Sequence, residues 1–115
     1  MPEVDPTGRD LHQPGAKADS GKIMGELLLE FSLAIEEVLK VGTFGAKKYT
    51  LGGWVEVPEG YRRYTGALIR HLLKERREDV DPDMDLPHQA AVAWNALARL
   101  ELMLRAKERA ARSKE

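Results

Sequence analysis

The chain has 115 residues, 43% of them hydrophobic and 32% charged, with a formal net charge of -1 at pH 7, as in a folded globular domain. It contains no cysteine, which excludes disulfides, zinc–thiolate sites and thiol nucleophiles. No apolar run approaches the roughly 20 residues of a membrane span, and the N-terminus lacks a signal-peptide core, so we expect a cytoplasmic protein without a membrane partner. The balanced charge makes nucleic acid an unlikely partner.

The N-terminal part is rich in residues that interrupt regular structure. Residues 1–21 contain three prolines and three glycines and few large apolar side chains, which predicts an extended or flexible arm. A single helical domain is expected over residues 22–110, followed by a charged tail at 111–115.

The first helix of this domain is expected to start near Lys22, in "KIMGELLLEFSLAIEEVLKVG", where apolar residues recur at helical spacing. Ser32 is an alternative start for a shorter helix, and Gly42 is a plausible end. One more helical turn is expected in "TFGAKKY". The stretch "TLGGWVEVPEGY" predicts a loop, with a possible short strand at "GWVEV".

Two further helices are expected, over residues 61–78 and from Pro87 to about Ala110, with Asp85 as the cap of the last one. The fold class is therefore all-α, a small antiparallel helical bundle. The last helix is apolar nearly all round, which indicates cover on more than one side and favours a homodimer or homotetramer.

Negative charge gathers in "EDVDPDMDLPHQ", at residues 78–89. These acids either solubilise a loop and cap a helix, or they hold a cation. An EF-hand is excluded because Met84 stands at the position of its glycine. Acidic and histidine side chains also share helix faces elsewhere. On the first expected helix these are Glu26, Glu30 and Glu37, with Glu36 on the other flank; on the second they are His71, Glu75 and Glu78. Each face is either a solvated surface or part of a site.

The last helix carries a polar stripe of His88, Asn95 and Arg99 between two apolar flanks. These groups either satisfy partners in a neighbouring helix or subunit, or line a ligand pocket, and we favour the pocket. Carboxylates with bases nearby are typical of a magnesium or manganese site that binds a polyphosphate. Candidate phosphate-binding cations are Lys17, Lys22, Lys47, Lys48 and Arg70, which could also be solubilising charges.

The succession "GAKADSGK", "LLLEFSLAIEEVLKVGTFGAKKY", "GGW", "GALIRHLL" and "EDVDPDMDLPHQAAVAWNALARLEL" resembles the phage and bacterial dATP/dGTP diphosphohydrolase N-terminal domain, a MazG-like all-α family. The resemblance covers roughly residues 15–104. It implies hydrolysis of a nucleoside triphosphate, with a purine deoxynucleotide expected, to the monophosphate and pyrophosphate, in the host cytoplasm if the gene is a phage's.

The resemblance also implies roles for individual residues. Acids on two antiparallel helices would bind Mg²⁺ or Mn²⁺, namely Glu36, Glu37, Glu78, Asp79 and Asp81. A base for water attack would be Glu37, His71 or His88. Phosphate oxygens would be held by Lys17, Lys22, Lys47, Lys48 and Arg70. Trp54 would stack on the nucleobase, and the amide of Asn95 would recognise the edge of the nucleobase.

Two other functions stay open at this point. The family's first acidic motif is Glu-x-x-Glu, whereas here Glu37 is followed by Lys40, which leaves a non-catalytic nucleotide-sensing or protein-interaction module as the alternative. A nucleic-acid accessory protein could use a basic face of the second helix, formed by Arg63, Arg70, Lys74 and Arg77, although the acidic turn that follows would repel a nucleic-acid backbone.

Overall fold

The computed structural model describes residues 3–114, and the chain divides into two compact units, Met1–Phe31 and Ser32–Glu115. Residues 1 and 2 of the expected arm and residue 115 of the expected tail lie outside the described residues. Each unit is described by itself.

The first unit is built on turns around Asp5, a buried carboxylate. Asp5 accepts hydrogen bonds from the hydroxyl of Thr7, at 2.6 Å, and from the backbone N–H of Arg9, at 3.0 Å. The N–H of Ser20 donates to the carbonyl of Val4 at 3.1 Å, which brings residues 4 and 20 together. The unit ends in the 3-10 helix η1, Gly25–Phe31.

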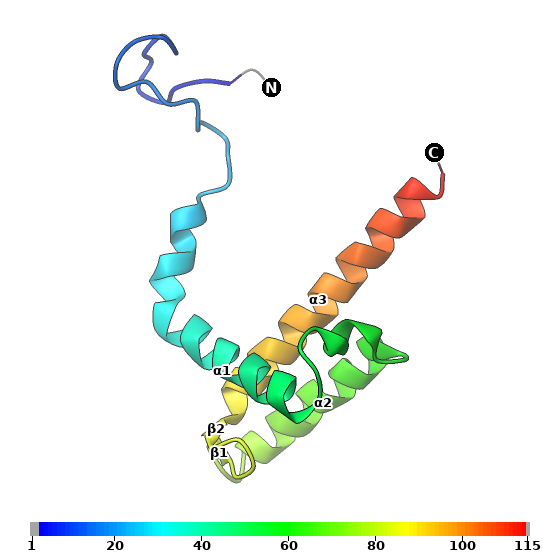
Figure 1. Cartoon of the computed structure of the whole chain (residues 1–115). Helices are drawn as coiled ribbons and strands as arrows, with labels where there is room; N and C mark the ends of the chain where they lie inside the picture. The colour runs from blue at the N-terminus through cyan, green and yellow to red at the C-terminus, as the bar shows by residue number, and fades with distance from the viewer. Residues whose placement is uncertain (1–2, 115) are drawn as a thin grey trace. The chain divides into compact units, whose positions relative to one another are not determined.

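The second unit is all-α apart from one short hairpin, which confirms the expected fold class (Figure 1). Its elements are α1, Ser32–Lys48; the 3-10 helix η2, Gly53–Glu56; α2, Gly60–Glu75; the strands β1, Val80–Asp81, and β2, Leu86–Pro87; and α3, His88–Arg112. None of the helices within residues 3–114 is long and apolar enough to span a membrane.

Helix α1 begins at Ser32, so the later of the two expected starts is the right one. Gly42 does not end the helix, contrary to the expectation, because α1 continues through it to Lys48. A glycine inside this helix has a packing reason: a Cβ atom on Gly42 would lie 2.9 Å from Nε1 of Trp94 in α3. The chain then leaves the helix and turns at Gly52, whose φ of 78° suits glycine.

Three details of the expected elements are wrong. The stretch "GWVEV" contains the turn of η2 rather than a strand, and α2 ends at Glu75, so Glu78 lies outside it. Asp85 makes no cap, since Pro87 occupies the N-cap position of α3 and no side chain bonds the helix end there. Asp85 instead has a φ of 55° in the turn between β1 and β2.

Helices α2 and α3 lie side by side and antiparallel, and α1 packs across the first part of α3 (Figure 1). Small side chains allow this approach: Ala90, Ala91 and Ala98 are buried, and Val41 of α1 packs against the first two. Trp54, Tyr64 and Trp94 pack edge to face beside this core, with ring centroids 5.6–6.2 Å apart. Among residues 3–114, the largest side chain that is completely buried is nevertheless polar, His88.

Candidate functional site

Three side chains that can bind a metal ion converge where α2, β1 and α3 meet. The Nδ1 atoms of His71 and His88 are 2.9 Å apart, and Oδ2 of Asp81 lies 3.9 Å from each of them. His88 is 0% exposed, Asp81 is 6% exposed and the His71 side chain is 18% exposed. Buried polar groups need partners, and these three serve one another.

The acidic bend positions Asp81 and His88 through its backbone. Strands β1 and β2 pair antiparallel, with Asp81 opposite Leu86, and the N–H of His88 donates to the carbonyl of Asp79 at 2.9 Å. The N–H groups of Asp83 and Met84 donate to Oδ1 of Asp81, at 2.8 and 3.1 Å. One carboxylate oxygen of Asp81 is thereby fixed by the turn, and the other faces the histidines.

Glu78 orients the ring of His88. Its Oε1 lies 3.1 Å from Nε2 of His88, and the Glu78 side chain is about half exposed (47%). An ionised carboxylate can only accept hydrogen bonds, so Nε2 of His88 carries the hydrogen and, in the neutral ring, Nδ1 presents a lone pair. The hydrogen between the two rings therefore belongs to Nδ1 of His71.

Electrostatics at the cluster favour an uncharged His71. Burial lowers the pKa of His71, and the neighbouring His88 lowers it further, while Asp81 acts in the opposite direction. The lower pKa keeps the ring neutral, which is the form that can donate a nitrogen lone pair to a metal or accept a proton.

The donor set fits a divalent cation. Within residues 3–114, the group of histidine and acidic side chains that can hold a metal ion is His71, Asp81 and His88. Two imidazole nitrogens and one carboxylate suit manganese, zinc or a similar ion, whereas magnesium prefers oxygen ligands. The acids Glu36, Glu37, Glu78 and Asp79, expected as ligands from the resemblance, are not part of this group.

The acids of α1 lie in different surroundings. Glu36 is exposed, whereas Glu37 is half-buried and accepts a hydrogen bond from Nζ of Lys40 at 2.8 Å. This bond raises the pKa of Lys40. Glu37 precedes Val41 by one helical turn, so it lies on the side of α1 that packs against α3.

The expected phosphate-binding cations are spread over both units. Lys47 and Lys48 are exposed at the end of α1, and Arg70 is exposed on α2, next in sequence to His71. Lys17 is exposed in the first unit, where Lys22 pairs with Glu3 at 3.3 Å. The basic face predicted for the second helix is shorter than expected, since α2 ends before Arg77.

The two residues expected to contact the nucleobase, Trp54 and Asn95, both interact with other residues of the second unit. Trp54 packs against Tyr64 and Trp94, and the guanidinium of Arg105 lies 5.8 Å from its ring centroid. Asn95 is buried, and its Nδ2 donates to the carbonyl of Ala91 at 2.8 Å. Contact of either residue with a base therefore requires these interactions to change.

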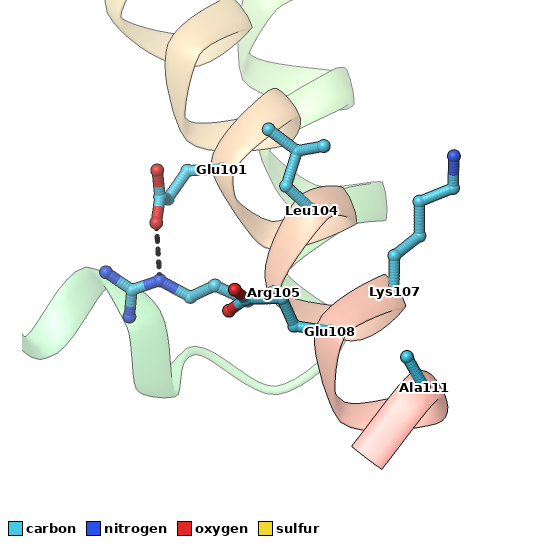
Figure 2. A pocket seen from close by; sticks show the side chains of 6 residues that line it. All are labelled: Glu101, Leu104, Arg105, Lys107, Glu108 and Ala111. Atoms are coloured by element: carbon cyan, nitrogen blue, oxygen red, sulfur yellow. Dashed lines mark hydrogen bonds and ion pairs between the residues drawn. The ribbon is translucent and has the colours of Figure 1, made fainter. Parts of the chain in front are cut away.

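Hollows in the surface lie elsewhere, along the second half of α3. One, of about 550 Å³, is lined by residues of α3 alone: Glu101, Leu104, Arg105, Lys107, Glu108 and Ala111 (Figure 2). Figure 2 shows the Glu101–Arg105 ion pair, 2.6 Å long, at its edge. A hollow along a single helix does not enclose a ligand. The histidine cluster is therefore the better candidate.

Comparison with known proteins identifies a family for the chain. No curated protein and no solved structure matches the chain. The family model described as "dATP/dGTP diphosphohydrolase, N-terminal" matches residues 12–112, nearly the whole sequence and all three helices of the second unit. The resemblance drawn from the sequence motifs is thereby confirmed, and the chain belongs to the dATP/dGTP diphosphohydrolase N-terminal family.

Proposed function

We propose that the chain hydrolyses purine deoxynucleoside triphosphates to the monophosphate and pyrophosphate, in the cytoplasm. The convergence of His71, Asp81 and His88 carries this proposal, in a chain whose family is described by dATP and dGTP hydrolysis. A buried histidine in contact with a partly buried histidine, beside a buried carboxylate, is an arrangement for chemistry rather than for core packing.

These three side chains would hold the divalent ion that the reaction needs. Such an ion neutralises charge on the triphosphate and makes the attacking water more acidic. Arg70 immediately precedes His71 in sequence and is exposed, which suits contact with phosphate oxygens. Lys47 and Lys48, at the end of α1, are proposed as further phosphate contacts.

Glu37 is the proposed base. In the reaction, the oxygen of water forms a bond to phosphorus, a P–O bond of the α–β bridge breaks, and pyrophosphate leaves. The proton of the water passes to the base. Glu37 is the half-buried acid of α1, and both histidines use Nδ1 within the cluster, which leaves the proton transfer to a carboxylate.

The test measures pyrophosphate release from the four deoxynucleoside and four ribonucleoside triphosphates, with Mn²⁺, Mg²⁺ or chelator. We expect release from dATP and dGTP that needs a metal and falls about 10²–10⁴-fold in Glu37→Gln. Asp81→Asn should lose metal-dependent pyrophosphate release. The matched controls, Asp83→Asn in the same turn and Glu101→Gln on α3, should retain metal-dependent pyrophosphate release. Orthophosphate release without pyrophosphate would refute the proposal.

One observation favours a second candidate, a non-catalytic nucleotide sensor. Lys40 occupies the place of the second acid in the family's first motif, and its ion pair engages the Glu37 carboxylate. A sensor binds nucleotide without releasing pyrophosphate. Binding of dATP by calorimetry, with no turnover in wild type or in Lys40→Glu, would establish the sensor instead.

Self-association as a homodimer or homotetramer is also proposed. Leu97, Leu100 and Leu104 share the side of α3 that faces away from the buried Ala98, and each is about half exposed. An apolar stripe of this kind in a chain with so small a core is typical of a subunit interface.

A further inference from the structure

The ligand atoms of the histidine cluster indicate which kind of metal ion it would bind. We propose that His71, His88 and Asp81 form a site for one transition-metal ion, such as Zn²⁺, Co²⁺ or Mn²⁺, that discriminates against Mg²⁺, with Glu78 as the residue that positions His88. This inference adds the identity of the ion and its ligands to the proposed function. Its test contains no nucleotide, so it can fail while hydrolysis stands, or stand while hydrolysis fails.

The distances are close to those that one shared ion requires. Ligand atoms about 2.1 Å from a common ion, at angles between 90° and 109°, lie about 3.0–3.4 Å apart. The two Nδ1 atoms are 2.9 Å apart, and Oδ2 of Asp81 is 3.9 Å from each. A shift of about half an ångström in the Asp81 carboxylate completes the geometry.

The ligands come from rigid elements. His71 lies inside α2 and His88 is the first residue of α3, while Asp81 belongs to β1. The turn fixes Asp81 through two backbone N–H groups on its other oxygen, Oδ1. A site held by three secondary-structure elements can bind an ion without ordering a flexible segment first.

The nature of the donors sets the preference. Imidazole nitrogen is a good ligand for zinc, cobalt and manganese, whereas Mg²⁺ takes oxygen ligands in octahedral geometry and gives up its waters reluctantly. Three protein ligands leave further coordination positions for water or a ligand oxygen, as in catalytic zinc sites.

Glu78 makes His88 a ready ligand. Metal-binding histidines commonly donate their second ring N–H to a carboxylate, and loss of that partner weakens binding by about 10–100-fold. Glu78 provides this bond at Nε2 of His88, which directs the lone pair of Nδ1 into the cluster.

Metal binding changes the state of His71. The hydrogen bond of Nε2 of His88 to Glu78 assigns the hydrogen between the two rings to Nδ1 of His71 in the free protein. A metal at Nδ1 replaces that hydrogen bond, so the neutral ring must carry its hydrogen on Nε2 instead. His71 is the more exposed of the two histidines, which allows exchange of this hydrogen with water.

The experiment uses the full chain stripped of metal with chelator. Equilibrium dialysis against Zn²⁺, Co²⁺ or Mn²⁺ is expected to give one bound ion per chain, and a hundredfold excess of Mg²⁺ should not displace it. His71→Asn and Asp81→Asn should abolish binding, and Glu78→Gln should weaken it about 10–100-fold. The controls His12→Asn, which removes the remaining histidine, and Asp83→Asn should bind normally.

A second readout needs no variant and therefore does not depend on how the variants fold. Nitrogen-15 NMR of the histidine rings in the wild-type chain should show Zn²⁺ at both Nδ1 atoms, with the hydrogen of His71 now on Nε2. Ring nitrogens of His71 and His88 that do not respond to Zn²⁺ would overturn the proposal. Equal binding of Mg²⁺, or binding unaffected by Asp81→Asn, would overturn it as well.

Discussion

Nδ1 of His71 and Nδ1 of His88 are 2.9 Å apart, although 17 positions separate the two residues in the chain. The contact joins the C-terminal half of α2 to the first residue of α3, across the hairpin of β1 and β2. It therefore ties the turn that carries the acids to both helices. The contact also gives a partner to the ring of His88, a polar group that has no access to water.

The two histidines should contribute unequally to stability. His88→Ala removes a fully buried ring together with its contacts to Glu78 and His71, so we expect a loss of about 2–4 kcal/mol in the free energy of unfolding. His71→Ala should cost about 0.5–2 kcal/mol because His71 is partly exposed. Urea unfolding in chelator measures both, with exposed His12→Ala as the control. Equal losses for the two variants would contradict this difference.

Helix content was predictable from this sequence because local rules decide it. Apolar residues at helical spacing predict three helices, and Pro87 predicts the start of the last one to within a residue. The end of α1 was not predictable in the same way. Gly42 is a helix breaker by propensity, but contact with Trp94 of α3, far away in sequence, keeps it inside the helix.

The members of the candidate site were predictable, but their assembly was not. The family resemblance assigned a separate role to each residue: His71 and His88 as candidate catalytic bases, and Asp81 as a metal ligand. Their convergence depends on strands of two residues, too short for a periodic signal. Glu78 was expected as a metal ligand rather than as the hydrogen-bond partner of His88. A tight turn over residues 78–88 brings its two ends together, and this was the available signal for the contact.

Two glycines of α1 should respond in opposite ways to alanine. Gly42→Ala places a Cβ atom 2.9 Å from Nε1 of Trp94, and we expect a net loss of about 1–2 kcal/mol. Gly45→Ala meets no atom within 4 Å and should stabilise the chain by about 0.5–1 kcal/mol, because alanine is the better helix former. Thermal unfolding of both variants tests this. If both melting temperatures rise, Gly42 and Trp94 are not in close contact.

Arg99 should stabilise the pairing of α2 with α3. Its Nε donates to the hydroxyl of Thr65 at 2.6 Å, and its guanidinium lies 4.6 Å from the ring centroid of Tyr61. Arg99→Met should therefore cost about 1–3 kcal/mol. Arg105→Met, which breaks the exposed pair with Glu101, should change stability by less than about 1 kcal/mol. In the Thr65→Val background, Arg99→Met should lower the free energy of unfolding by less than it does in the wild type. If the effects of the two substitutions are strictly additive, the hydrogen bond between Arg99 and Thr65 contributes nothing to stability.

The Asp5 carboxyl of the first unit should titrate below the ordinary range. The Thr7 hydroxyl lowers the pKa of Asp5 from 3.8, and burial acts in the opposite direction. A lowered pKa means that the ionised form stabilises the turns above about pH 3.8, and that this stabilisation is lost as the pH falls through the lower folded value. Thr7→Val should move the pKa, measured by NMR titration, back towards 3.8, while Thr7→Ser should leave it low. A pKa unchanged in Thr7→Val would contradict the assignment.

The apolar stripe of α3 gives a direct test of self-association. Leu100 and Leu104 are 48% and 47% exposed and lie on the side of α3 opposite its contact with α2, so a second copy of the chain is the expected cover. Sedimentation velocity of the wild type should give two or four times the monomer mass of 12.9 kDa. Leu100→Glu and Leu104→Glu should produce monomers, because association would bury a charge without a partner. Leu51→Glu is the matched control, since Leu51 is 91% exposed in a loop and the same charge there should leave the assembly intact. A wild-type chain that sediments as a monomer at micromolar concentration would show that the stripe of α3 is not an interface between copies.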